Sequence, residues 1–254
     1  MKDSCFCIAS KERQFVKLCK KHRGGSVHFT GEPEIDALIN DVKKYPHLFV
    51  LACLMDRQIK AERAWKIPYL VCRDLCGAQY EFSPLAELTQ SQIESYFKTE
   101  KLHRYNDTMS HIFYKAVQKI AKDYAGNASK IWVGNNSANI IYNFLCFEGC
   151  GIKIASMATN LLHRIFGVKY TDYSAIDISP DIHIRRVLFR LGFIEDENDI
   201  NMAIYRAKSI NPQYPGLLDE CCWDVGRRYC DPSCPNCIEC ELNIICDFAS
   251  KKIK

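Results

Sequence analysis

Four cysteines in the last part of the chain constrain its fold more than any other feature, because they are spaced C-x6-C-x2-C-x5-C. They are Cys230, Cys237, Cys240 and Cys246. So short a segment cannot build a hydrophobic core of its own, and four thiolates within it indicate a bound metal. Zinc is one candidate, since Cys234 offers an alternative ligand set with Cys237, Cys240 and one neighbour. We therefore expect this segment to fold as a metal-bound loop.

The remaining cysteines are better explained as buried free thiols. The chain has 15 cysteines, an odd number, and most of them lie in apolar segments. This distribution argues against a secreted scaffold held together by disulfides. The first residues lack the apolar core of a signal peptide. The longest apolar run, Leu48 to Met55, is shorter than the roughly 18 residues that a membrane span needs. We expect a cytoplasmic protein without a membrane segment.

The spacing of apolar residues predicts helices throughout. The chain has 254 residues, of which 48% are hydrophobic and 25% charged, as in a soluble globular protein. Leu48 to Met55 is apolar on all sides, which is typical of a buried central helix. The clearest amphipathic stripe is preceded by Asn106 or Asp107 as a cap and closed by Gly126; it consists of Met109, Ile112, Phe113, Ala116, Val117, Ile120 and Tyr124. No strand pattern of any length occurs, so we expect an all-α fold.

A glycine-rich turn between two helical segments carries the most informative chemistry. Gly149 and Gly151 are separated by one residue, which predicts a turn too tight for Cβ atoms. A helix that starts there leaves backbone N–H groups free to bind a phosphate. Lys153 follows at once, and Asp181 stands at the start of a later helix, after Pro180. The alternatives are an ordinary connection between helices, a solvated lysine, and an aspartate favoured by the helix dipole.

Taken together, this turn, Lys153, Asp181 and the cysteine loop resemble the endonuclease III superfamily of helix-hairpin-helix DNA glycosylases. The resemblance implies a six-helix barrel over residues 39–166, which contains the hairpin. It also implies an iron-sulfur domain built from residues 1–38 and 167–254, with a 4Fe-4S cluster on Cys230, Cys237, Cys240 and Cys246. The active site would lie in the cleft between the two domains. Cys234, Cys221 and Cys222 would not be ligands.

The same resemblance assigns residues that contact DNA. Gly149 and Gly151 would let backbone amides approach a phosphate. Gln58, just after the buried apolar run, occupies the place of a glutamine that fills the gap left by a flipped base; a surface role at a helix end is the alternative. Arg104 stands where the family inserts a leucine into the base stack. This departure puts the identity of the inserted residue, and the substrate preference, in doubt.

The resemblance implies a base excision repair glycosylase that also cleaves abasic sites. Lys153 would attack the sugar and form a Schiff base, with Asp181 activating the lysine or stabilising positive charge. The substrate would be a damaged base, an oxidised pyrimidine by analogy, and the partner would be double-stranded DNA with a damaged base or an abasic site. We expect a monomer that associates with the nucleoid. The alternatives are a glycosylase of the same fold that uses water alone, and a non-catalytic iron-sulfur DNA-binding protein.

Overall fold

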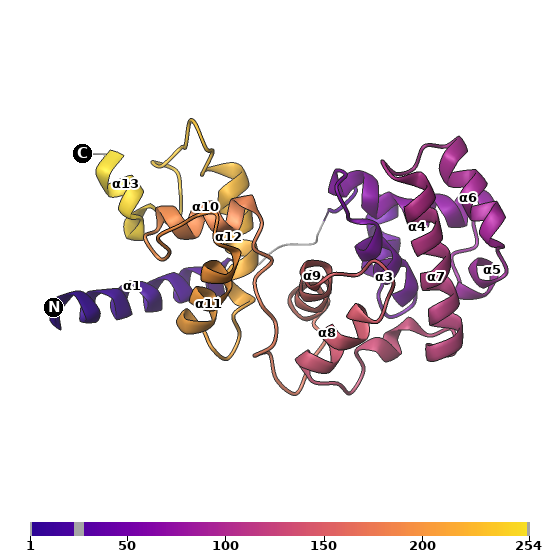
Figure 1. Ribbon diagram of the computed structural model, residues 1–254, viewed down its shortest axis with the longest axis horizontal. Helices are drawn as coiled ribbons and strands as arrows, with labels where there is room; N and C mark the ends of the chain where they lie inside the picture. Colours follow the sequence, from indigo (N-terminus) through magenta and orange to yellow (C-terminus); the bar gives the residue numbers. More distant parts are fainter. Residues whose placement is uncertain (1, 23–27, 253–254) are drawn as a thin grey trace. The chain divides into compact units, whose positions relative to one another are not determined.

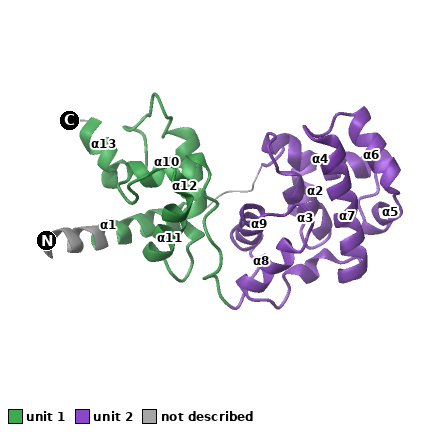
Figure 2. Cartoon of the chain, in the orientation of Figure 1, with its two compact units in different colours: residues 1–24, 172–254 green, residues 25–171 purple. Residues whose placement is uncertain are grey.

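The computed structural model describes residues 2–22 and 28–252, and every regular element in this part of the chain is a helix (Figure 1). This confirms the all-α prediction. The chain divides into two compact units (Figure 2). Unit 1 consists of residues 1–24 and 172–254, and unit 2 of residues 25–171. Unit 2 begins before residue 39 because α2 (Pro33–Asn40) packs against α3 and α4 of the same unit.

Unit 2 is built around one helix that is buried on all sides. α3 (Pro46–Met55) has only buried residues and packs against α2, α4, α7 and α9. The other elements of the unit are α4 (Ala61–Leu75), α5 (Phe82–Ala86), α6 (Gln90–Thr99), α7 (Asn106–Tyr124), the 3-10 turn η1 (Ala128–Ile131), α8 (Ser137–Leu145) and α9 (Ile152–Arg164). The expected buried central helix is therefore confirmed.

Local capping signals set the ends of several of these helices. Thr89 and Gln92 form a capping box at the start of α6, each bonding to the backbone of the other. The side chain of Asn136 accepts a hydrogen bond from the amide of Asn139 at the start of α8. The apolar stripe of α7 is buried apart from the partly exposed Tyr124. These two caps fix where α6 and α8 begin.

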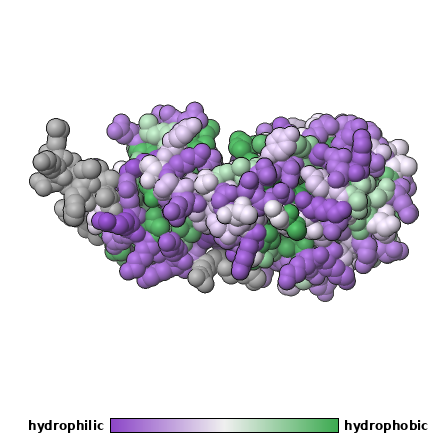
Figure 3. Space-filling view, turned by 90° about the horizontal axis from the view of Figure 1, so that it is seen from below, coloured by the Kyte–Doolittle hydropathy of each residue, from purple (hydrophilic) through white to green (hydrophobic). Residues whose placement is uncertain are grey.

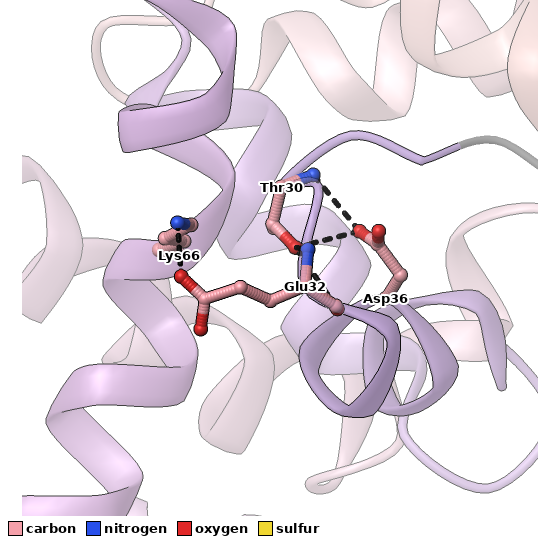
Figure 4. A network of polar contacts seen from close by, with 4 residues as sticks. All are labelled: Thr30, Glu32, Asp36 and Lys66. Atoms are coloured by element: carbon pink, nitrogen blue, oxygen red, sulfur yellow. Dashed lines mark hydrogen bonds and ion pairs between the residues drawn. The ribbon is translucent and has the colours of Figure 1, made fainter.

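A buried carboxylate ties the segment before α2 to the rest of unit 2 (Figure 4). The backbone N–H and the hydroxyl of Thr30 both donate to Asp36 Oδ1, at 2.9 and 2.8 Å. Glu32 forms an ion pair with Lys66 of α4. These contacts link the segment to α2 and α4, so residues well before position 39 belong to the core of this unit.

Unit 1 joins the two ends of the described chain. α1 (Lys2–Lys21) packs against α11 (Ile200–Ile210), α12 (Leu217–Arg228) and the 3-10 turn η2 (Asn243–Ile245). α10 (Ile182–Arg190) and α13 (Asp247–Lys252) complete the unit. Its core contains Phe15 and Cys19 of α1 together with Leu188, Cys221 and Cys222.

A buried arginine connects the helices of unit 1 to the cysteine loop. Arg186 of α10 is 5% exposed and donates from Nε to the carbonyl of Cys230 at 2.6 Å. Its Nη2 donates to the carbonyl of Gly226 at 2.9 Å. Because each backbone carbonyl accepts from a charged donor, the start of the loop is held firmly against α10 and α12.

The surface of the described residues is mainly polar. On the face shown in Figure 3, hydrophilic residues surround small apolar areas in both units. Among residues 2–22 and 28–252, no helix has the length and apolar character needed to cross a bilayer.

Candidate functional site

The hairpin between α8 and α9 requires only one of its two glycines for its own geometry. Gly149 has a φ of 77°, and a Cβ at this position would lie 2.6 Å from Cδ1 of Ile112. Gly151 has a φ of −95°, which any residue adopts, and a Cβ there would meet nothing within 4 Å. The expectation of a turn too tight for Cβ atoms is thus right for Gly149 and wrong for Gly151. Nothing within the described protein requires glycine at position 151.

The start of α9 is open to solvent and carries no side-chain cap. Gly151 is its N-cap residue and has no side chain to bond the first amides. Those N–H groups have no partner within a helix. The other side of the turn is anchored, because Phe147 is 2% exposed and its ring stacks on Tyr124 with centroids 6.2 Å apart. A rigid turn thus presents backbone donors beside empty space, which suits a small anion.

Lys153 lies in the first turn of α9 with an exposed side chain. Its positive charge acts on Asp56 at the end of α3, a residue that the sequence did not single out. Burial raises the pKa of Asp56, while a hydrogen bond from Trp65 and the positive charge of Lys153 act in the opposite direction. Nε1–H of Trp65 donates to Asp56 Oδ2 at 3.3 Å. The available signal was the abrupt change from an apolar run to a carboxylate.

Asp181 belongs to unit 1 and serves as the N-cap of α10. Its Oδ1 accepts hydrogen bonds from the amides of His183 and Ile184, both at 2.9 Å. The sequence offered a charge favoured by the helix dipole as the alternative to a catalytic role, and a position at the start of α10 is compatible with that alternative. Both bonds use Oδ1, so the cap itself does not depend on Oδ2.

Gln58 and the segment that contains Arg104 lie side by side in unit 2. The hydroxyl of Tyr105 donates to Oε1 of Gln58 at 2.7 Å. The guanidinium carbon of Arg104 lies 5.4 Å from the centre of the Tyr105 ring. All three side chains are exposed. The sequence identified Gln58 and Arg104 separately, but it gave no sign that Tyr105 connects them.

The cysteine loop brings together the four thiols that the spacing singled out. Cys230, Cys237, Cys240 and Cys246 are all partly buried, whereas Cys234 is exposed. Burial, and then the proximity of the other three thiols, raises the pKa of Cys240 to about 11. Nη1–H of Arg190 donates to the sulfur of Cys230 at 3.3 Å.

A set of four clustered thiols next to a cation fits a metal or an iron-sulfur cluster, because the cation offsets the negative charge of bound thiolates. Cys221 and Cys222 are buried in the core of unit 1, as part of its packing.

One group of residues in the described part of the chain has ligand atoms close enough together to share a single metal ion. It consists of His22, Cys221 and Glu241, whose ligand atoms lie within 4.8 Å of one another. Nδ1 of His22 lies 3.0 Å from Glu241 Oε1, and Nε2 lies 3.6 Å from Asp224 Oδ2. Both ring nitrogens thus face carboxylates, an arrangement that ties the end of α1 to α12 and the loop.

Comparison with known proteins gives matches in structure only. No protein family matches the chain, and no curated protein sequence does. A thermostable thymine-DNA glycosylase aligns with a TM-score of 0.62 and 18% identity, covering 95% of this chain and 98% of the other. A trapped covalent intermediate of endonuclease III with DNA gives 0.54 and 17%, covering 87% and 98%. A non-covalent complex of endonuclease III with DNA gives 0.56 and 16%, covering 99% and 97%. The chain has the endonuclease III-like helix-hairpin-helix fold.

Proposed function

We propose that the protein is a base excision repair DNA glycosylase that also cleaves abasic sites, with Lys153 as the nucleophile. The observation that carries this proposal is Gly151. It stands at the uncapped start of α9 with open space beside it, two residues before an exposed lysine, in a chain with the fold of DNA glycosylases. A glycine that the protein does not need for its own packing supports close approach by an external group.

That external group is a phosphate of double-stranded DNA. The free amides at the start of α9 would bind one phosphate, and such a contact holds DNA without reading its sequence. The target base lies inside the duplex and must be flipped out before chemistry can occur. Gln58, exposed at the loop after α3, would fill the space that the base leaves. The lesion is a damaged base or an abasic site, and we propose an oxidised pyrimidine.

The reaction follows from an amine that attacks a sugar. Nζ of Lys153, in its neutral form, forms a bond to C1′ while the bond from C1′ to the base breaks. The base leaves with that electron pair and accepts a proton. Opening of the sugar gives an imine on Lys153, loss of a proton from C2′ expels the 3′ phosphate, and water then frees the lysine. The carboxylate of Asp181 would accept the lysine proton or stabilise positive charge on the sugar.

The cysteine loop would hold a 4Fe-4S cluster. Cys230, Cys237, Cys240 and Cys246 supply four thiols, and Arg190 supplies a nearby positive charge. When bound, the cluster would contribute folding free energy to a segment that has little core of its own. Arg186 of α10 bonds to the carbonyl of Cys230, so an ordered loop would help to hold α10 and its cap residue Asp181 in place.

A second candidate is a glycosylase that uses water and does not cleave the strand. The similarity to a thymine-DNA glycosylase favours it, while the exposed Lys153 after the hairpin favours the lyase. The third possibility is a protein that binds DNA without catalysis.

One experiment separates the lyase from the other two candidates. The protein is incubated with a duplex that contains an abasic site, in the presence of borohydride, which reduces an imine to a stable amine. We expect a covalent complex with the wild type and none with Lys153→Gln. Lys122→Gln is the matched control, because Lys122 is also exposed and lies in unit 2, on α7. This variant should trap DNA like the wild type. No trapping by the wild type would refute lyase chemistry, and trapping by Lys153→Gln would refute the role of Lys153.

A further inference from the structure

Gln58 has a backbone conformation that glutamine rarely adopts. Its φ is 56°, in the left-handed region, and it lies in the short connection between α3 and α4. For a residue with a Cβ this conformation is strained. It persists only where the surroundings fix it, so the contacts of Gln58 become informative.

The contact that fixes the side chain is the hydroxyl of Tyr105, which donates to Oε1 at 2.7 Å. Tyr105 is itself anchored through its backbone, because its N–H donates to Nδ1 of His103 at 3.0 Å. Nε2–H of His103 in turn donates to the carbonyl of Met55, the last residue of α3, at 3.2 Å. This route connects the end of the buried helix to the tip of Gln58.

His103 is suited to this role because it stays neutral. It is 2% exposed, and burial is the main cause that lowers its pKa. A neutral imidazole has one nitrogen that accepts and one that donates, which matches the two bonds it makes. The guanidinium carbon of Arg104 lies 5.4 Å from the centre of the Tyr105 ring, a contact that helps to keep the ring in place. Arg104 therefore supports Tyr105.

The bond to Tyr105 holds the Gln58 amide in one orientation in this structure. The amide oxygen accepts from the phenol, so the NH2 group, which has only donors, points away from Tyr105. At the centre of the pairing edge, adenine and cytosine carry a ring nitrogen that accepts a hydrogen bond. Guanine and thymine carry an N–H there, which an NH2 group cannot satisfy.

We infer that Tyr105 is a positioning residue that fixes Gln58 as a donor toward the unpaired base, and so selects adenine or cytosine opposite the lesion. This inference rests on the proposed function.

The test uses binding and needs no catalysis. Duplexes carry a stable tetrahydrofuran abasic analogue opposite adenine, cytosine, guanine or thymine, and dissociation constants are measured by fluorescence anisotropy. We expect the wild type to bind about five-fold more tightly opposite adenine and cytosine, the effect of one hydrogen bond. In Tyr105→Phe the ring and Arg104 remain but the amide is free to rotate, so the ratio should fall to about one.

The matched control is Tyr205→Phe, because Tyr205 is 68% exposed on α11 in unit 1 and should leave the ratio unchanged. Gln58→Ala, like Tyr105→Phe, should bring the ratio of affinities between the two pairs of duplexes to about one. Equal binding of all four duplexes by the wild type, or an unchanged ratio in Tyr105→Phe, would overturn the inference while leaving the proposed function intact. A wild type that binds the analogue no better than an undamaged duplex would overturn both.

Discussion

Replacement by alanine should have different effects at the two glycines of the hairpin: it should lower stability at Gly149 and DNA affinity at Gly151. In Gly149→Ala, the left-handed backbone with a φ of 77° costs about 1 to 2 kcal/mol for any residue with a Cβ. The overlap of that Cβ with Ile112 Cδ1, at 2.6 Å, adds about 1 to 3 kcal/mol of overpacking. We expect a loss of about 3 kcal/mol in the free energy of unfolding. A loss of that size is large for a single methyl group.

In Gly151→Ala, the new Cβ meets no atom within 4 Å and the backbone needs no left-handed conformation. The only cost is that alanine is a poorer N-cap residue than glycine, which is worth about 0.5 to 1 kcal/mol. DNA binding should suffer instead, because the methyl group occupies the space through which a phosphate reaches the amides. Loss of one charge-assisted hydrogen bond, about 1.5 to 3 kcal/mol, corresponds to at least a ten-fold weaker complex.

Urea unfolding measures the free energy of unfolding of each variant. Fluorescence anisotropy with an abasic duplex at fixed salt measures its affinity for DNA. The informative result is the crossed pattern, in which Gly149→Ala loses stability and Gly151→Ala loses affinity. If Gly151→Ala binds DNA as tightly as the wild type, the open space beside position 151 is not a phosphate site. If Gly149→Ala is as stable as the wild type, the account of the turn is wrong.

Three further predictions concern the cysteine loop, the cap of α10 and a buried histidine. Cys237→Ser should lose the brown colour of an iron-sulfur cluster and much of its stability, whereas Cys234→Ser should keep both; stoichiometric zinc without acid-labile sulfide would contradict this. Asp181→Asn should retain the stability of α10, because asparagine caps as well as aspartate, but should cleave abasic DNA slowly in single-turnover assays; unchanged cleavage would remove Asp181 from the mechanism. Burial lowers the pKa of His47 to about 4, so stability present above about pH 6.5 should be lost toward pH 4, by up to about 3 kcal/mol. His47→Gln keeps a donor for the carbonyl of Tyr80 and should flatten this dependence in urea unfolding followed across pH; an equally steep loss would exclude His47 as the cause.

Local signals in the sequence were sufficient for most of the helices. The apolar run of α3 and the periodic stripe of α7 predict burial directly, because both depend on residues a few positions apart. The capping residues Thr89 and Asn136 likewise act within one turn. The start of unit 2 could not be predicted from such local signals. It depends on the hydrogen bonds from Thr30 to Asp36 and on the packing of α2, which exist only in the folded core.

The candidate site was predictable in its residues and not in its geometry. The spacing of Gly149, Gly151 and Lys153 located the hairpin, but the sign of φ at each glycine depends on the folded turn. The bond between Tyr105 and Gln58 joins positions 47 residues apart, so no short-range pattern indicates it. The interaction of Asp56 with Lys153 is equally long-range.

The composition of unit 1 has a consequence for synthesis on the ribosome. α1 is translated before unit 2, whereas its partners α11, α12 and η2 are translated only after all of unit 2. Phe15 and Cys19 of α1 are fully buried in the folded protein. While unit 2 is being made, the residues that bury them have not yet been translated. During that interval the nascent chain carries an amphipathic helix without a partner, which is the kind of exposed surface that chaperones bind. This exposure ends only when α11, α12 and η2 have been made and pack against α1.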